Sequence, residues 1–203
     1  MRTRTPTSAA YACLVMLAAC TGGQTGDEGP TGRPDASRPT DAGTSAENFF
    51  DSLRQGFGNY DAARSIEELA ERSDVIALGT IASVGEGRPA SIDRGDLATA
   101  FVELAVIEVL AGDLSERFYI ELYVGHVFDA ARLPDPLPEN RLLVFLIPAT
   151  ASDAAAPEGE PLYTLTTPQG MMVERESGSI DTVDLAVAGT FDELIDRVRD
   201  AQP

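Results

Sequence analysis

His126 is the only histidine in this chain of 203 residues, so any serine triad would have to use it as the general base. Asp129 follows three residues later and is a candidate to orient the imidazole ring. No Gly-x-Ser-x-Gly sequence, the nucleophile elbow of many hydrolases, accompanies it. We therefore interpret His126 as a loop histidine and keep a histidine-dependent hydrolase as the alternative.

The charged residues restrict the chemistry further. All 15 basic residues are arginine, because the chain contains no lysine, and this excludes Ser-Lys dyads, Schiff bases and a phosphate-loop lysine. Carboxylates are abundant, and a glycosidase would need two of them across a cleft, but an acidic surface brings many carboxylates together by accident. Asp93 with Asp96, or Asp135 with Glu139, could bind Ca²⁺, although no EF-hand spacing occurs. We expect no cofactor and no metal site.

Aromatic residues offer a binding surface instead of a catalytic one. Tyr119 and Tyr123 stand on the same face of an expected strand, and His126 follows shortly after it. These three residues are the candidate binding residues of the chain. We favour partly buried packing under a loop for the two tyrosines and keep a small aromatic binding surface as the alternative.

The N-terminus has the pattern of an export signal. Arg2 and Arg4 precede an apolar run of 11 residues at positions 9–19. A bilayer-spanning helix needs about 20 apolar residues, so this run is too short to span a membrane permanently. A basic start, a short apolar run and small residues at its end are typical of a secretory signal.

The apolar run ends in Leu17-Ala18-Ala19-Cys20, which resembles the lipobox of bacterial lipoproteins at all four positions. The resemblance implies cleavage before Cys20 and a diacylglycerol on its thiol. Residues 1–19 would then be the signal peptide, and the mature chain would be anchored by lipid on the extracytoplasmic side of the cell membrane. If the host has two membranes, the outer one is a candidate location.

Residues 20–46 are expected to form a disordered tether behind this lipid anchor. Positions 21–46 hold six glycines, three prolines and five threonines, and alanine supplies their only apolar side chains. Such a composition cannot bury enough surface to offset its ordering entropy. Random-coil scaling gives the tether a mean reach of about 28 Å.

The net charge excludes nucleic acid as a partner. The chain carries −18, and loss of the two arginines in residues 1–19 would make this −20. An acidic chain without basic clusters cannot neutralise a phosphate backbone.

Residues 47–203 have the size of a single β-rich domain with a helix at each end. Helical patterns open this domain with Phe49, Leu53 and Phe57, and close it with Phe191, Leu194, Ile195 and Val198. Capping boxes are expected at Ser65 with Glu68 and at Thr190 with Glu193.

Strand signals lie between the helices. We expect strands over 75–84, 98–110, 118–124, 141–147, 162–166, 171–174 and 180–183. The first should stop at Gly85, the strand over 118–124 should be half-buried, and the strand over 141–147 should be central. The strands over 162–166 and 171–174 are expected to pair with 180–183. No regular βαβ alternation appears. The fold class is therefore α+β, mainly β with flanking helices, built as a mostly antiparallel OB-like barrel or a sandwich.

The order of these elements resembles a group of exported bacterial domains with an OB-like, netrin/TIMP-like barrel. The resemblance rests on residues 73–81, 108–113, 140–146 and 168–173 and covers a little over half of the chain. Protease inhibitors of that superfamily act through an N-terminal cysteine amine on zinc. Cys20 is expected to be lipidated and to precede a tether, so this activity is not implied here.

These observations favour a membrane-anchored envelope lipoprotein with a non-catalytic binding module for an envelope protein or glycan. The alternative is an envelope hydrolase that uses His126 or a pair of carboxylates. Both hypotheses place the partner outside the cytoplasm. The oligomeric state does not follow from the sequence.

Overall fold

The computed structural model describes residues 46–54, 60–88, 90–92, 95–125, 129–149 and 156–202. Cys20, the expected signal peptide and nearly all of the expected tether, as well as His126, lie outside these ranges. The described part is mainly β, with a closed five-stranded barrel, extra strands and a few short helices. It has the OB-like barrel arrangement and not that of a sandwich.

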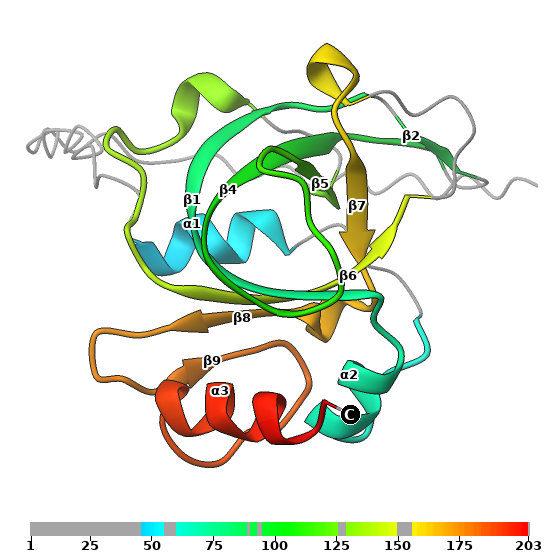
Figure 1. The fold of residues 1–203 in the computed structure, drawn as a ribbon. Helices are drawn as coiled ribbons and strands as arrows, with labels where there is room; N and C mark the ends of the chain where they lie inside the picture. Colours follow the sequence, from blue (N-terminus) through cyan, green and yellow to red (C-terminus); the bar gives the residue numbers. More distant parts are fainter. Residues whose placement is uncertain are drawn as a thin grey trace, which may run out of the picture. The chain divides into compact units, whose positions relative to one another are not determined.

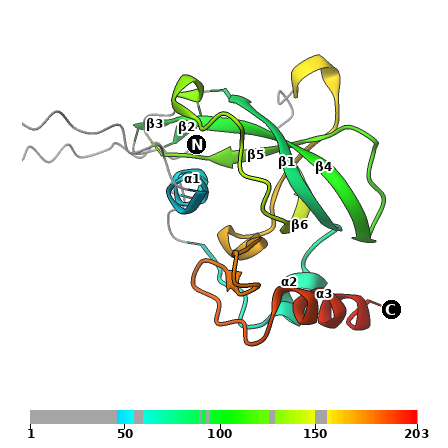
Figure 2. The ribbon, with the colours of Figure 1, turned by 90° about the vertical axis from the view of Figure 1, so that its left-hand side faces the viewer.

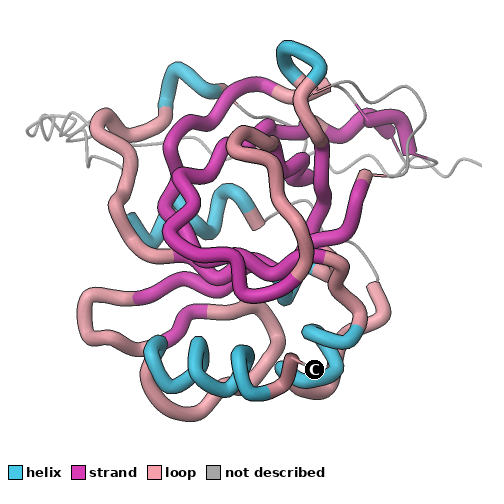
Figure 3. Tube along the Cα trace, in the orientation of Figure 1, coloured by secondary structure: helices cyan, strands magenta, loops and turns pink. Residues whose placement is uncertain are grey.

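Five strands close the barrel (Figure 1, Figure 3). They are β1 (Val75–Glu86), β4 (Thr99–Ala111), β5 (Tyr119–Tyr123), β7 (Leu162–Leu165) and β6 (Leu142–Pro148). Each pairs with the next in this order, and β6 returns to β1. The β5–β7 pair is parallel and the other four pairs are antiparallel.

The remaining elements extend the barrel. β8 (Met171–Glu174) pairs with the first three residues of β6, and β9 (Ile180–Asp181) pairs with β8. The hairpin of β2 (Ala90–Ile92) and β3 (Gly95–Leu97) lies between β1 and β4 in the chain. The helices are α1 (Ala46–Leu53), α2 (Ile66–Glu71) and α3 (Phe191–Asp200), and single 3₁₀ turns are η1 (Ala130–Arg132), η2 (Pro157–Gly159) and η3 (Pro168–Gly170).

The almost wholly apolar β6 strand is buried on both faces. Leu142, Val144 and Leu146 point into the barrel, where they join the core that also takes up α1. Leu143 and Phe145 point outward into a second core beneath α2 and α3. A strand buried on both faces needs apolar residues at every position, which explains why β6 shows no polar alternation.

The helices occupy two separate places. α1 lies across one end of the barrel (Figure 1, Figure 2). Its residues Phe49, Phe50 and Leu53 belong to the barrel core. α2 and α3 pack side by side on the outer face of β1, β6 and β8. Burial of an apolar face, more than local propensity, stabilises helices as short as these.

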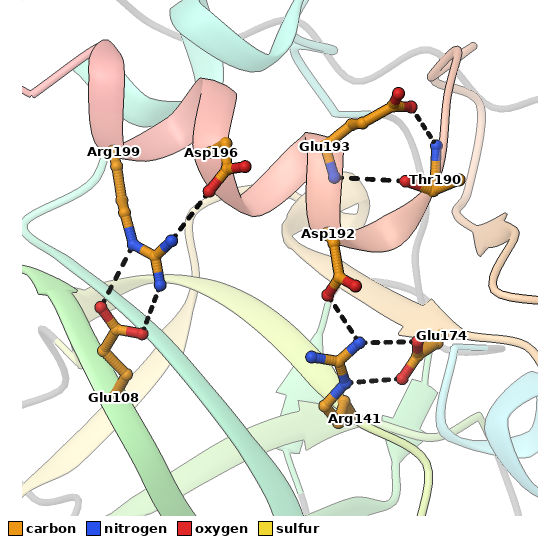
Figure 4. A network of polar contacts seen from close by, with 8 residues as sticks. All are labelled: Glu108, Arg141, Glu174, Thr190, Asp192, Glu193, Asp196 and Arg199. Atoms are coloured by element: carbon orange, nitrogen blue, oxygen red, sulfur yellow. Dashed lines mark hydrogen bonds and ion pairs between the residues drawn. The ribbon is translucent and has the colours of Figure 1, made fainter.

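Two arginines join α3 to the strands (Figure 4). Arg141, just before β6, donates to both carboxylate oxygens of Glu174 at 2.6 and 2.7 Å and to Asp192 of α3 at 2.8 Å. The hydrogen bonds to Glu174, and then to Asp192, raise the pKa of Arg141 above its ordinary value. Arg199 of α3 donates to both oxygens of Glu108 on β4 at 3.2 and 2.7 Å.

The structure confirms the expected caps with one difference. Thr190 and Glu193 form the complete capping box of α3, since each side chain bonds to the backbone of the other residue. Ser65 also caps α2 as expected. The Glu68 carboxylate, however, accepts from the Arg64 amide and not from that of Ser65, so the reciprocal half of this box is shifted by one residue.

Three expectations about the strands were wrong. β1 does not stop at Gly85 but continues to Glu86, because pairing with β4 holds the glycine in the ladder. β7 does not pair with residues 180–183; it lies between β5 and β6, and only β8 pairs with β9. β5 is not half-buried, because side chains from outside the strand cover Tyr119 and Glu121 on its outer face.

Candidate binding face

The outer surface of β4 and β5 is the candidate functional site. Ala100, Val102, Ile120 and Leu122 belong to the barrel core, so the alternate residues of both strands point outward. We define the β4–β5 face by three cross-strand pairs: Thr99 with Tyr123, Phe101 with Glu121, and Glu103 with Tyr119. Ser83 and Gly85 of β1 extend it, since they pair with Glu103 and Phe101.

The position of this face within the fold corresponds to the ligand-binding strands of OB-folds. OB-folds bind oligonucleotides and oligosaccharides on the face of their second and third strands and on adjoining loops. In this barrel, β4 and β5 are the second and third strands in chain order. The hairpin β2–β3, which belongs to the connection between the first two barrel strands, lies at the end of this face (Figure 2).

One end of the face is held by a chain of polar contacts around Arg117. The Arg117 Nε donates to Glu103 Oε1 at 2.8 Å, and its Nη2 donates to the Tyr119 hydroxyl at 2.7 Å. Ser83 donates to the other oxygen of Glu103 at 2.9 Å. The guanidinium carbon also lies 5.5 Å from the centre of the Tyr119 ring, within cation–π range. These contacts explain why Tyr119 is only 5% exposed.

The other end of the face contains a buried carboxylate. Glu121 is 5% exposed, and Arg88 donates to both of its oxygens at 2.9 and 3.0 Å. The Thr99 hydroxyl lies 3.2 Å from Glu121 Oε1 and 2.7 Å from the Arg88 carbonyl oxygen. A bidentate arginine–carboxylate pair has a fixed geometry, so it positions Arg88 and the adjacent start of the β2–β3 hairpin.

The backbone around the hairpin base is also fixed. The Gly87 amide donates to the Thr99 carbonyl at 2.8 Å. At the other end of the hairpin, the Ala98 amide donates to the Gly125 carbonyl oxygen at 2.7 Å, and the Val124 amide donates to the Ala98 carbonyl oxygen at 3.0 Å. Gly87 and Ala98, which flank the hairpin in the chain, are therefore hydrogen-bonded to the start of β4 and to the residues that follow β5.

Phe101 occupies the middle of the face. Its ring lies edge to face with that of Tyr119, with 6.3 Å between the ring centres. Phe101 is only half-buried, and its partner across β1 is a glycine, Gly85. The centre of the face is therefore an aromatic ring bordered on each side by an arginine–carboxylate pair.

The sequence-derived binding residues are only partly brought together here. Tyr119 and Tyr123 lie on the same face as expected, with Glu121 between them. Tyr119 is buried, Tyr123 is half-buried, and the aromatic partner of Tyr119 is Phe101. His126 lies outside the described residues, one position beyond Gly125.

Sequence reasoning missed Phe101, Gly85, Arg88 and Arg117 as members of the face. The alternation of β4 would have marked Phe101 as an outward-facing aromatic residue. The arginines carry no comparable signal, because their carboxylate partners come from other strands. Gly85 was interpreted as the end of a strand, which removed it from the face altogether.

The charged groups of the face are paired with one another. Both oxygens of Glu103 and both oxygens of Glu121 accept hydrogen bonds from neighbouring protein side chains. Within the described ranges, no group of three or more His, Cys, Asp or Glu side chains is arranged to hold a metal ion. Nor does any helix in this part of the chain have the length and apolar character needed to cross a membrane. The arrangement is suited to recognition through a ring surface and hydrogen bonds.

Comparison with known proteins adds no assignment. A scan against protein-family models finds no match, and a search of curated proteins finds none of significant sequence similarity.

Proposed function

We propose that this chain is a lipid-anchored envelope protein whose barrel is a non-catalytic binding module for an envelope protein or glycan. The β4–β5 face is its binding surface. The observation that carries the proposal is the half-buried Phe101 ring, held between two arginine–carboxylate pairs on the face with which OB barrels bind their ligands.

The anchor rests on the lipobox at Leu17-Ala18-Ala19-Cys20 and the export signal before it. A tether over residues 20–46 would let the barrel stand away from an anionic membrane, which a chain of net charge −18 would not approach closely. Labelling of the expressed chain with an alkyne fatty acid tests this. Incorporation that is lost in Cys20→Ser supports the anchor, and equal labelling of both forms would contradict it.

Affinity capture from solubilised envelopes of the source organism tests the binding face. The bait is the full chain in three forms: wild type, Gly85→Arg and Ile107→Arg. Gly85 lies on the face, whereas Ile107 is an exposed residue of β4 beyond the part that pairs with β5, and both variants add one arginine to a strand.

We expect the wild type and Ile107→Arg to retain the same protein or glycan and Gly85→Arg to lose it. Equal capture by all three forms would move the binding surface elsewhere on the barrel. A glycan that the wild type shortens would favour the hydrolase alternative over a binding module.

A further inference from the structure

Gly85 is a glycine for which the described structure supplies no internal reason. A Cβ at Gly79 would lie 2.7 Å from the Ala105 carbonyl oxygen, and one at Gly87 would collide with the Thr99 hydroxyl. A Cβ at Gly85 would meet nothing within 4 Å, and its φ does not lie in the left-handed region. Glycine weakens a strand interior, and an isolated one often marks a bulge, a tight bend at a barrel corner, or a place where a ligand or another backbone approaches closely. The nearest register shift of β1 lies between Ile81 and Ser83, and Gly85 itself stands in regular pairing with Phe101.

The open space over Gly85 lies beside Phe101. The two residues are directly paired across β1 and β4, and paired residues point to the same face of the sheet. The edge-to-face contact with Tyr119 fixes the orientation of the Phe101 ring. The glycine therefore leaves room for a flat group beside a positioned aromatic ring.

Charge selects among the ligands that could enter this space. Arg88 with Glu121 and Arg117 with Glu103 contribute two positive and two negative charges, so these two pairs together are neutral within a chain of net charge −18. An anionic polymer would be repelled by the surrounding surface. A cation would compete with arginines for carboxylates that they already occupy.

A sugar ring fits these conditions. It presents a C–H face to an aromatic ring and a rim of hydroxyl groups to hydrogen-bonding side chains, and a partly exposed arginine lies at each end of the face, Arg88 at 34% and Arg117 at 42%. A protein partner would need a contact of about 800 Å² on each side with an apolar centre. The exposed apolar part of this face centres on one ring.

Resting on the binding function proposed above, we infer that the β4–β5 face binds a neutral polysaccharide, with one sugar ring stacked on Phe101 in the space over Gly85. Arg88 and Arg117, which are partly exposed, donate to its hydroxyl groups. The ligand class is thus an uncharged glycan of the envelope.

Saturation-transfer difference NMR and calorimetric titration of the full chain in a mild detergent test this inference. The probes are N-acetylchitohexaose, cellohexaose and maltohexaose, with hexagalacturonate as the anionic comparison. The variants are Gly85→Val, which fills the space with a residue that suits a strand, and Phe101→Leu, which keeps an apolar side chain without a ring face. Ile107→Val is the matched control on β4, and a thermal unfolding curve of each variant monitors the fold.

We expect at least one neutral hexasaccharide to bind, with saturation transferred to the C–H protons of its ring. Gly85→Val and Phe101→Leu should each weaken this binding by about tenfold or more, while Ile107→Val leaves it unchanged. Gly85→Val should not lower the unfolding temperature, because the new side chain enters open space.

The inference is overturned if no neutral hexasaccharide binds, if Gly85→Val binds it as well as the wild type, or if hexagalacturonate binds more tightly. These failures differ from failure of the proposed function. An envelope protein captured by the wild type but not by Gly85→Arg, without saccharide binding, would keep the binding face and replace the glycan by a protein partner.

Discussion

The buried pair of Arg88 and Glu121 should respond unequally to removal of its two members. Glu121 is 5% exposed, whereas the Arg88 side chain is 34% exposed. Arg88→Met leaves a buried carboxylate without its cation, a change that costs about 3–5 kcal/mol of unfolding free energy. Glu121→Gln leaves an arginine that can turn toward water, so we expect a loss of about 1–2 kcal/mol from the weaker hydrogen bond.

The double variant Arg88→Met with Glu121→Leu isolates the interaction. Because it removes both charges, it should be more stable than Arg88→Met alone, and the coupling energy of the cycle should be about 2–3 kcal/mol. Urea unfolding of the full chain, followed by circular dichroism, measures all four free energies. For a domain of this size, 1 kcal/mol corresponds to about 2–4 °C in Tm, so thermal unfolding gives a second readout.

Arg132→Met is the matched control for this cycle. Arg132 is 85% exposed and pairs with Asp129 on the surface, so its loss should change stability by no more than about 0.5 kcal/mol. The reasoning is refuted if Arg88→Met costs no more than Glu121→Gln. It is also refuted if the effects of Arg88→Met and Glu121→Leu add without coupling.

Three further predictions concern the scaffold. Gln169 is fully buried, and its amide bonds to the backbone N–H and C=O of Ala63, so Gln169→Ala should cost about 2–4 kcal/mol in urea unfolding because these groups are left unpaired. Thr190→Ala removes the cap of α3 and should cost about 1 kcal/mol in the same assay. Hydrogen bonds from its own backbone amide and from Arg197 lower the pKa of Glu67 to about 2, from an ordinary 4.5. The ionised Glu67 therefore contributes stability above pH 4.5, and this contribution is lost as the pH falls toward 2. The wild type should lose more stability over this interval than Glu67→Gln.

Each of these predictions has a control and a contrary outcome. Gln169→Ala should be compared with Gln202→Ala near the C-terminus, and similar stabilities would show that the buried amide is dispensable. Thr190→Ser retains a capping hydroxyl, so its stability should stay near that of the wild type. Parallel acid unfolding curves for the wild type and Glu67→Gln would contradict the lowered pKa of Glu67.

Much of the fold followed from local patterns in the sequence. Alternation located β5, β-branched composition located β1 and β4, and the uninterrupted apolar run identified β6 as central. The capping residue Thr190 located the start of α3. These signals succeed because side-chain periodicity and helix caps act within a few neighbouring residues.

The candidate face was predicted less completely. The sequence placed Tyr119 and Tyr123 on one strand face but gave no sign that Tyr119 is covered by Arg117 or that its ring meets Phe101. The half-buried pattern of the strand over 118–124 placed Glu121 on its polar side, although Arg88, 33 residues away in the chain, buries it. Burial of a polar side chain depends on a distant partner, which periodicity cannot identify.

The sequence by itself determined the type and approximate position of each major strand and of α2 and α3, the mainly β class of the domain and the exclusion of lysine chemistry. Only the tertiary structure decided that β6 closes on β1, that β5 and β7 run parallel, and that Gly85 lies opposite Phe101. The physical reason is that strand pairing joins residues far apart in the chain through backbone hydrogen bonds, which every residue except proline can make. The pairing partner, and with it the composition of the binding face, is therefore set by how the whole barrel closes.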